Sequence, residues 1–287
     1  MSPGIDKMEM LAAAAGRGRL RIEDVVKIYE TPEGPTLAVD HCSLAIEPGE
    51  ICMIVGPSGC GKTTLLNAVA GFHDLTSGRI TLDGVELVGP GKHTEAGPDR
   101  VVVFQNGALF PWMTALDNVM FGPLAQRTMN RAQARDKARA MMADAGLSDI
   151  ETMFPSQMSS GIRRRVEIVR AMMNDPAILL LDEPYRAMDS LTRAMMHEAL
   201  LEMHSRKPVT IMFITHDLEE AVFLGNRIVV MSARPCRPTL ELDIEISYPR
   251  SYEITTGTAY RQYVQQALDA VHEEAVKSFA AGEREAA

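Results

Sequence analysis

The chain has 287 residues, of which 46% are hydrophobic and 23% are charged, and its formal net charge is −9. This length suits one large domain or two modest ones, and the acidic balance argues against a surface built mainly for nucleic acid. The sequence has no apolar run near the roughly 18–20 residues of a transmembrane helix, and its charged N-terminus is unlike a secretory signal. The four cysteines, whose spacing is not typical of zinc or redox sites, are expected to be free thiols in a reducing cytosol: Cys42, Cys52, Cys60 and Cys236.

The first part of the chain predicts a flexible segment followed by β-structure. Residues 1–19 are rich in alanine, glycine and charge, and we expect them to be flexible. Between Leu20 and Ile46, short alternating apolar stretches are interrupted by proline and glycine. This alternation favours the edge of an antiparallel sheet.

Residues Gly56–Thr64 contain the most informative motif, a glycine followed by four residues and then Gly-Lys-Thr. Glycines let several backbone N–H groups point at one anion, so the pattern is typical of a loop that cradles phosphate. The apolar run Ile51–Val55 precedes it and a helical stretch follows, so the loop is expected at a helix N-terminus, which also favours phosphate. Lys62 would place its charge on the β- and γ-phosphates, and the Thr63 hydroxyl would ligate Mg²⁺. We therefore predict a nucleoside triphosphate site, against the alternative of a chance glycine turn, in which the loop residues are Gly56, Pro57, Ser58, Gly59, Cys60, Gly61, Lys62, Thr63 and Thr64.

A hairpin, a strand and a helical region are expected next. Arg79–Leu87 predicts a hairpin with Asp-Gly at its turn, and Val101–Phe104 predicts a buried strand. Gln105 follows that strand directly. From Asp117 to about Asn174 the pattern becomes helical, and we expect a helical subdomain over about residues 106–174.

Within this region, the turn Ser159–Gly161 opens a helix and predicts a second anion site. Ser159 is a good N-cap, and the small Ser-Ser-Gly run leaves backbone N–H groups exposed at the positive end of the helix. Two such sites on one chain make little sense, but across two chains the second could close over the nucleotide of the first. The residues by themselves favour the simpler interpretation, an ordinary capped helix whose arginine run Arg163–Arg165 faces solvent.

Continuous apolar runs over Ala177–Leu181, Val209–Ile214 and Ile228–Met231 alternate with helical stretches. Strands of this kind are typical of a parallel sheet that is covered on both faces, so the fold class is α/β. In such sheets, ligands bind beyond the carboxyl ends of the strands.

Polar residues stand at the ends of these strands. Asp182 is expected to hold Mg²⁺, and Glu183 to polarise the attacking water as a general base. Gln105 could sense both Mg²⁺ and that water, and His216 could donate to the γ-phosphate. Taken singly, strand-end residues of these types are common, and a solvated acidic strand end is the alternative. Their joint placement is what favours catalysis.

From about Leu20 to Pro238 the chain resembles the ATPase subunit of an ATP-binding-cassette (ABC) transporter. The resemblance rests on six motifs in the order of that family: the phosphate loop Gly56–Thr64, the glutamine loop at Gln105, the signature helix start Met158–Ile162, the strand end Asp182-Glu183, the loop at Asp189 and the switch His216. It implies a P-loop NTPase fold with a mostly parallel core sheet, an antiparallel β subdomain and the inserted helical subdomain. Residues 20–240 would form the ATPase domain, and residues 241–287 a C-terminal extension.

The same resemblance implies a role for each site residue. Those expected in catalysis are Glu183, His216, Gln105 and Lys62, and those expected to hold Mg²⁺ are Thr63, Gln105 and Asp182. Tyr29 would stack on adenine. The residues expected to reach the nucleotide of a facing subunit are Ser159, Ser160, Gly161 and Asp189. The implied assembly is a homodimer, or a heterodimer with a second ABC ATPase, and it binds ATP and Mg²⁺. It would lie peripherally at the cytoplasmic face of the inner membrane, bound to membrane permease subunits. A solute-binding protein would be an indirect partner.

Residues 104–119 and 215–221 are similar to the importer subfamily for nitrate, alkanesulfonates, taurine and related small solutes. In that subfamily the segment after the glutamine docks on a short helix of the permease. The resemblance therefore places Phe110, Pro111 and Trp112 at the docking surface, where an exposed tryptophan suits an interface. The sequence does not identify the transported solute.

Two motifs depart from the family pattern. Ser160 stands where the signature usually has glycine, and Arg186 stands where the Asp189 loop usually has serine or glycine. Both favour slow hydrolysis or an unlike partner, and they leave open a nucleotide sensor that barely hydrolyses ATP. A soluble ABC ATPase of DNA repair or translation is the other alternative; the acidic balance and the lack of a long coiled-coil insert or a second cassette disfavour it.

Two further expectations concern the tail and one thiol. Apolar residues recur at helical spacing, and predict a helix that packs on its own domain or else docks on a partner: Tyr260, Val264, Leu268, Val271, Ala275 and Phe279. Because Cys60 lies within the phosphate loop, bulky thiol reagents should block ATP binding, and ATP should protect this thiol.

Overall fold

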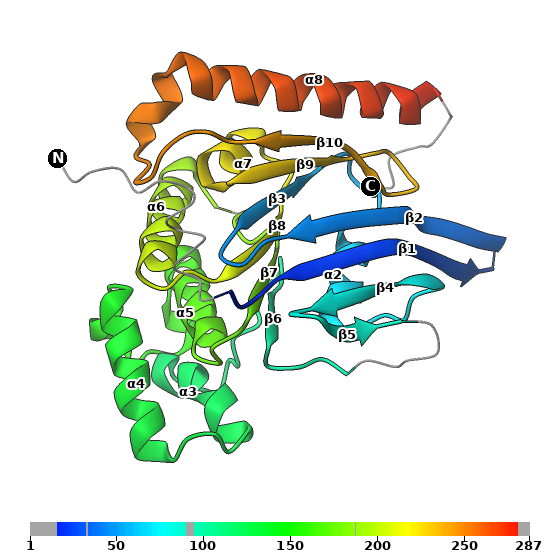
Figure 1. Ribbon diagram of the computed structural model, residues 1–287. Coiled ribbons are helices and arrows are strands. Elements are labelled where there is room, and N and C mark those ends of the chain that lie inside the picture. Colours follow the sequence, from blue (N-terminus) through cyan, green and yellow to red (C-terminus); the bar gives the residue numbers. More distant parts are fainter. Residues whose placement is uncertain (1–15, 33, 90–94, 187, 281–287) are drawn as a thin grey trace.

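The computed structural model describes residues 16–32, 34–89, 95–186 and 188–280, which are arranged around two β-sheets (Figure 1). The predicted flexible segment 1–19 lies outside the described residues up to position 15, as do residues 281–287 of the C-terminal extension. The backbone N–H groups of Gly18 and Arg19 each donate to the Asp83 carboxylate at 2.8 Å. This contact ties the start of the described chain to the turn after strand β4 (Ser77–Leu82).

One sheet has four antiparallel strands in the order β2-β1-β4-β5. The strands are β1 (Leu20–Thr31), β2 (Gly34–Ile46), β4 and β5 (Val85–Val88). Asp83 and Gly84 join β4 to β5 with positive φ angles of 52° and 79°, the backbone that tight hairpin turns require. The predicted antiparallel sheet and its Asp-Gly hairpin are therefore confirmed.

The second sheet has six strands in the order β10-β9-β3-β8-β7-β6. They are β3 (Ile51–Val55), β6 (Arg100–Val103), β7 (Ile178–Asp182), β8 (Thr210–Ile214), β9 (Arg227–Met231) and β10 (Pro238–Asp243). The first five run parallel, which confirms the prediction from the continuous apolar runs. Strand β10 is antiparallel to β9 and was not predicted; its alternate side chains are exposed, as suits an edge strand.

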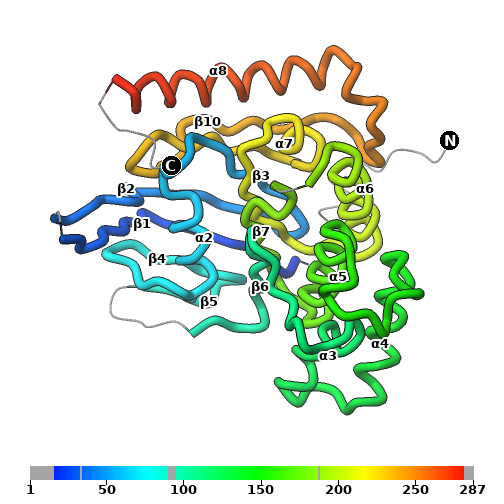
Figure 2. The backbone as a smooth tube through the Cα atoms, turned by 180° about the vertical axis from the view of Figure 1, so that it is seen from behind, coloured from blue at the N-terminus to red at the C-terminus, as the bar shows by residue number. Residues whose placement is uncertain are grey.

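Each face of the six-stranded sheet has its own hydrophobic core. On β3, Ile51, Met53 and Val55 face one core, while Cys52 and Ile54 face the other. Helix α2 (Lys62–Ala70) packs between the two sheets, against β7 and β8 on one side and β2 and β5 on the other (Figure 2). The opposite face is covered by α5 (Ser160–Met172), α6 (Ser190–Arg206) and α7 (Leu218–Leu224).

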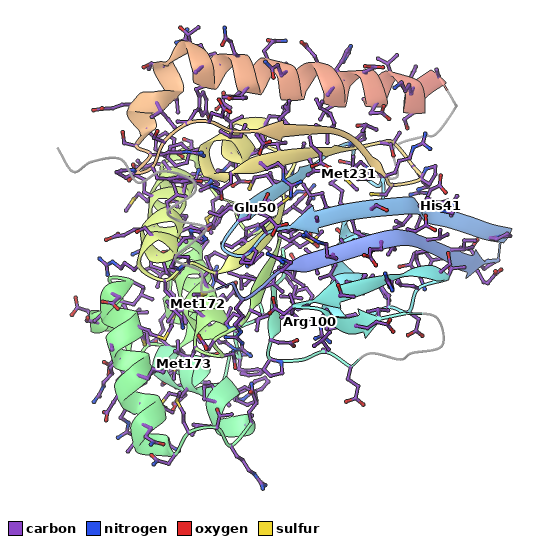
Figure 3. The ribbon with its side chains drawn as sticks, viewed as in Figure 1. His41, Glu50, Arg100, Met172, Met173 and Met231 are labelled. Atoms are coloured by element: carbon purple, nitrogen blue, oxygen red, sulfur yellow. The ribbon has the colours of Figure 1, made fainter. Side chains whose placement is uncertain are left out.

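A third core lies among α3 (Ala115–Ala125), α4 (Arg131–Asp144) and α5. Short 3₁₀ turns at Ser148–Ile150 and Pro155–Gln157 connect α4 to α5. Met172 packs in the sheet core and its neighbour Met173 in this helical core, so the end of α5 joins the two (Figure 3). The limits of the predicted helical subdomain, about 106 and 174, stay a prediction.

The C-terminal part forms a 3₁₀ turn at Tyr252–Thr256 and then α8 (Thr258–Ala280), which packs on α7, β9 and β10 (Figure 1). Its buried residues are Tyr260, Ala267 and Glu274, whereas Leu268 and Phe279 of the predicted stripe are exposed. Repeated steps of four residues rotate by about 40° each around a helix, so that stripe turns away from the sheet. Among the helices of the described residues, none combines the length and apolar character needed to cross a membrane.

Candidate functional site

The phosphate loop, Gly56–Thr64, joins the carboxyl end of β3 to the first turn of α2. Glycine is required at two of its positions. A Cβ on Gly56 would lie 2.8 Å from the Met231 carbonyl oxygen at the end of β9 (Figure 3), and a Cβ on Gly61 would lie 2.5 Å from the Ala38 carbonyl oxygen. Both glycines also have positive φ, 152° and 118°. The loop can therefore curl tightly only because these two residues lack side chains.

Lys62 is the cation of this loop, and it is buried. Its Nζ donates to the Gly56 carbonyl oxygen at 2.9 Å and to the Pro57 carbonyl oxygen at 2.8 Å, and it lies 3.6 Å from Cys60 Sγ. The residue before α2, Gly61, supplies no side-chain cap to the helix. Backbone N–H groups and one ammonium thus converge where an anion could bind.

Two side-chain oxygens meet beside the loop. Thr63 Oγ1 lies 3.3 Å from Asp182 Oδ1, at the end of strand β7, which is separated from β3 by β8. Burial raises the pKa of the Asp182 carboxyl, although the Thr63 hydroxyl acts in the opposite direction. Hard oxygen ligands of this kind suit a divalent cation such as Mg²⁺, so these residues fit the predicted metal site.

Glu183 and His216, predicted from separate strand ends, come together. Glu183 Oε1 lies 3.2 Å from His216 Nδ1, and its Oε2 accepts from Arg186 Nη1 at 3.1 Å. The Glu183 backbone has a φ of 43° and donates to the Ile214 carbonyl oxygen of β8 at 3.0 Å. A backbone angle that is uncommon outside glycine is held by the neighbouring strand, as is frequent at functional positions.

A small cavity lies next to this pair. It is lined by Glu183, Tyr185, Arg186, Arg193, Thr215, His216, Asp217 and Glu220, and its volume is about 10 Å³. That volume is near the lower limit for one water molecule. A carboxylate, an imidazole and room for one water are the elements of general base catalysis.

Gln105 follows β6 with an exposed side chain, and its backbone is held by α5. Arg164 donates to the carbonyl oxygens of Phe104 and Gln105, at 2.8 and 2.7 Å, and to Glu167 at 2.6 Å. Glu167 in turn accepts from the Ala108 N–H at 2.8 Å. Sequence reasoning missed this buried pair, because it treated Arg163–Arg165 as a solvated run. The available signal was the acid three residues after Arg164, on the same helix face.

The second predicted anion site is intact as a helix start. Ser159 Oγ accepts from the Ile162 N–H at 3.3 Å, as expected of an N-cap, and Ser159 and Ser160 are exposed. Gly161 is buried, and a Cβ there would lie 2.7 Å from Thr192 Cγ2 of α6. Asp189 caps α6 by accepting from the Thr192 N–H at 2.9 Å, a bond that lowers the pKa of this carboxyl. Residue 187, within the Asp189 loop, lies outside the described residues.

Tyr29 and the predicted docking residues belong to other segments of the chain. Tyr29 lies on β1, with Lys27 Nζ 4.9 Å from its ring centre and His73 edge-on to it. The Phe110 ring stacks on Trp112 at 5.4 Å, and the Arg170 guanidinium lies 4.2 Å from the Phe110 ring. Trp112 is 69% exposed.

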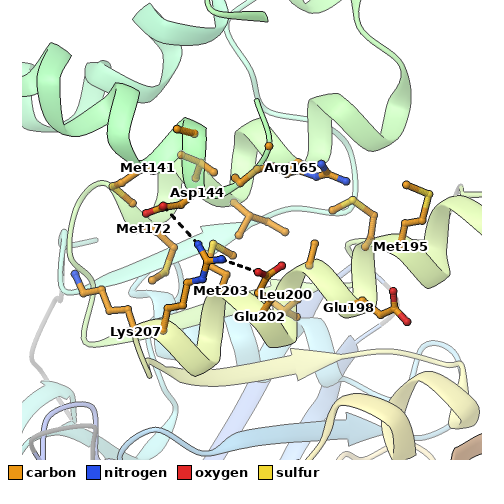
Figure 4. A pocket seen from close by; sticks show the side chains of 18 residues that line it. Met141, Asp144, Arg165, Met172, Met195, Glu198, Leu200, Glu202, Met203 and Lys207 are labelled. Atoms are coloured by element: carbon orange, nitrogen blue, oxygen red, sulfur yellow. Dashed lines mark hydrogen bonds and ion pairs between the residues drawn. The ribbon is translucent and has the colours of Figure 1, made fainter. Parts of the chain in front are cut away.

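A larger cavity of about 510 Å³ lies between α4, α5 and α6 and is rich in methionine (Figure 4). Arg206 bridges Asp144 and Glu202 at its wall. None of the predicted site residues lines this cavity. Its size therefore does not locate the chemistry, which the strand ends locate instead.

Comparisons with known proteins identify the family of the chain. The pattern of the family described as "ABC transporter" matches residues 39–186. The nitrate import ATP-binding protein NrtD of Synechococcus elongatus is 38% identical over 90% of this chain and 93% of its own length. The bicarbonate transport ATP-binding protein CmpD of the same species is 40% identical over 80% of this chain and 81% of its own.

Solved structures give the same fold. The dimeric structure of MJ0796, described as a bacterial ABC transporter cassette, is 30% identical with a TM-score of 0.67, covering 78% of this chain and 98% of that one. A second structure of MJ0796, described as a post-hydrolysis state bound to ADP and Pi, is 28% identical with a TM-score of 0.65 over the same shares. The predicted α/β cassette fold is confirmed.

Proposed function

Because the chain belongs to the ABC transporter family of ATP-binding proteins, we propose that it is the motor subunit of an importer that takes up a small solute of the nitrate, sulfonate or taurine class. Relatives described as nitrate import and bicarbonate transport subunits favour a small anion. The observation that carries the proposal is that three groups converge at the carboxyl ends of the parallel strands. These groups are the phosphate loop after β3, the Thr63–Asp182 pair at β7, and the Glu183–His216 pair between β7 and β8.

Nucleotide binding would begin at the phosphate loop. Lys62 would move from the Gly56 and Pro57 carbonyl oxygens to the β- and γ-phosphates, because a phosphate is a stronger acceptor for an ammonium than a neutral carbonyl. The uncapped N–H groups of α2 would add to that binding. Tyr29 would offer its ring to the adenine.

The metal site would use Thr63 and Asp182, with Gln105 approaching from the end of β6. A bound Mg²⁺ would neutralise phosphate charge. Gln105 is exposed while its backbone is fixed by Arg164, so its side chain can report the contents of the site to the segment that follows it.

Hydrolysis would depend on Glu183 and His216. Glu183 would accept a proton from a water held beside it, and His216 would donate to the γ-phosphate. Arg186 competes for the same carboxylate at 3.1 Å. Glu183 is therefore fully available only when this ion pair opens.

The facing subunit would complete the site. Proteins of this family work as dimers with membrane permeases, and the fold neighbour MJ0796 is described as a dimer. In this chain Ser159, Ser160 and Asp189 are exposed, and the side chains of Ser159 and Asp189 accept hydrogen bonds from the first turns of the helices they cap. We propose that they reach across to the nucleotide of a second copy, or of a second, unlike ABC ATPase.

The permease would dock on the aromatic surface formed by Phe110, Pro111 and Trp112. Asn118, fully buried, fixes this loop by bonding both the N–H and the carbonyl of Phe110, at 2.8 and 3.1 Å. An exposed tryptophan on a rigid loop is typical of an interface hot spot. This surface would hold the chain at the cytoplasmic face of the inner membrane, where a solute-binding protein would deliver the solute from the other side.

The deciding experiment places the purified chain with its permease subunits in lipid vesicles and measures phosphate release with and without solute. The importer predicts solute-stimulated release that falls at least about 100-fold in Glu183→Gln, because a general base contributes that much or more. Glu202→Gln is the control, because Glu202 forms an exposed ion pair with Arg206 on α6. This variant should keep the wild-type rate of phosphate release. Tight ATP binding without stimulated release would contradict the importer.

Tight ATP binding without stimulated release would support the second candidate function, a nucleotide sensor. One observation favours this candidate. The Arg186–Glu183 ion pair occupies the proposed general base within the chain itself. If this function holds, ATP would change the affinity for a protein partner while phosphate release stays low in both wild type and Glu183→Gln.

A further inference from the structure

Cys60 and Cys236 are 176 positions apart in the sequence, yet the fold places them together at the phosphate loop. Cys236 lies between β9 and β10. Its N–H donates to the Ala38 carbonyl oxygen at 2.9 Å, and its carbonyl accepts from the Asp40 N–H at 3.1 Å. Its Cβ lies 2.8 Å from the position that a Cβ on Gly61 would take. The backbone of Cys236 is thus fixed against the loop.

Both side chains are buried in the same hydrophobic core, which lies between the two sheets. The neighbouring Cys236 thiol lowers the pKa of Cys60 to about 6, helped by the charge of Lys62, whose Nζ lies 3.6 Å from Cys60 Sγ, although burial acts in the opposite direction. The Cys60 sulfur and burial raise the pKa of Cys236. A thiol with a lowered pKa thus lies beside a second thiol, as in pairs that form disulfides.

We propose that Cys60 and Cys236 are a redox-sensitive pair, which a peroxide converts into a disulfide that holds the phosphate loop in the form seen here. The Cys60 thiolate attacks one peroxide oxygen, the O–O bond breaks, and the leaving hydroxide takes a proton to become water. Cys60 is then a sulfenic acid. The Cys236 sulfur attacks it, the S–O bond breaks, and the second hydroxide leaves with the Cys236 proton as water. Two thiols lose two electrons, and one peroxide becomes two waters.

Lys62 couples this oxidation to nucleotide binding. In the form seen here its ammonium contacts the Cys60 sulfur and the loop carbonyls. When it turns to phosphate, the thiolate loses its cation and reacts more slowly. The reverse also holds, because a disulfide ties the loop to the segment between β9 and β10 and opposes the movement that phosphate requires. Nucleotide and oxidant should therefore each weaken the effect of the other.

The proposal is tested on the full chain with hydrogen peroxide. After treatment, free thiols are alkylated under denaturing conditions, the chain is digested, and linked peptides are identified by mass spectrometry. Binding of a fluorescent ATP analogue is measured on the same samples. We expect a Cys60–Cys236 linked peptide, a loss of affinity of at least about tenfold that dithiothreitol reverses, and slower linkage when ATP is present.

Two variants separate the pair from the other buried thiols. Cys236→Ser should bind the analogue like the wild type before treatment, give no linked peptide, and lose less affinity after it. Cys42→Ser should behave like the wild type throughout, because burial raises the pKa of Cys42 to about 12 and leaves it unreactive. The proposal fails if Cys60 is modified without a linked peptide, if it links to Cys42, or if the linked protein binds nucleotide as tightly as the reduced one. None of these outcomes depends on a permease, so failure here leaves the importer proposal in place.

Discussion

The phosphate loop and the turn Ser159–Gly161 are both helix starts suited to an anion, but they differ in what surrounds them. In the loop, Lys62 is buried and bonded to carbonyls of its own chain, and Gly56 and Gly61 are pressed against neighbouring backbone. At the second helix start, Ser159 and Ser160 are exposed, and the Ser159 hydroxyl accepts from the Ile162 N–H of its own helix. The phosphate loop is thus held by contacts within the chain, whereas the second helix start is capped and exposed.

Arg164, on the helix that begins at Ser160, ties that helix to the segment after β6, and its removal should have the largest effect. Arg164→Leu leaves Glu167 buried without its partner and two loop carbonyls without a donor. Breaking a buried ion pair from one side costs about 3–5 kcal/mol of unfolding free energy. The urea midpoint measures this loss.

Arg139→Ala is the matched control, because Arg139 forms an exposed pair with Glu151 and such pairs contribute about 0–1 kcal/mol. If both variants lose similar stability, Arg164 does not stabilise the segment after β6 through a buried contact.

Removing the Lys62 ammonium should weaken ATP binding at the phosphate loop. Lys62→Ala is expected to lower ATP affinity by about 100-fold, because a charge-assisted hydrogen bond contributes about 1.5–3 kcal/mol and Lys62 can make more than one. Isothermal titration measures the affinity. Lys207→Ala, an exposed lysine paired with Asp175, should bind ATP as the wild type does. Equal affinity in Lys62→Ala would show that the phosphates lie elsewhere.

A change at the helix start near Ser159 should instead impair hydrolysis and leave ATP binding intact. Ser159→Phe places a ring at the helix start without touching the loop, so ATP affinity should stay within about twofold while hydrolysis falls about 30-fold, the loss of one good hydrogen-bonding site for the phosphate. Phosphate release and titration on the same sample separate the two effects. Loss of ATP binding in this variant would contradict the contrast between the regions.

Mixing the last two variants sharpens the same contrast. A dimer of one Lys62→Ala chain and one Ser159→Phe chain contains one site in which both halves are intact. Half of randomly mixed dimers pair unlike chains, so hydrolysis should return to about a quarter of the wild-type rate if the subunits are identical. No recovery would point to an unlike partner ATPase.

Much of this comparison could be predicted from the sequence, because the relevant patterns are local. The glycines of Gly56–Thr64, the apolar runs of the parallel strands and the Ser159 cap each follow from short-range backbone rules. Contacts between distant segments could not be predicted in this way. The burial of Arg164 depends on a loop about sixty positions away, and the Cys60–Cys236 contact depends on how the end of β9 meets β2. The exposure of Leu268 likewise depends on which face of α8 packs against the sheet.

The smallest expected effect concerns Arg186, at the point where the two halves would meet. Its guanidinium is 56% exposed and lies 3.1 Å from Glu183 Oε2, so the ion pair contributes less than about 1 kcal/mol, and its removal should release the carboxylate only partly. Arg186→Ala is therefore expected to raise phosphate release by about two- to fivefold, with unchanged ATP affinity. Arg206→Ala, similarly exposed and paired with Glu202, is the control and should leave the rate unchanged. A fall in the rate would mean that Arg186 assists the reaction, for example by reaching the partner across the dimer, and that its contact with Glu183 belongs to the open form alone. A rise would instead show that this chain restrains its own general base until a facing subunit draws the arginine away.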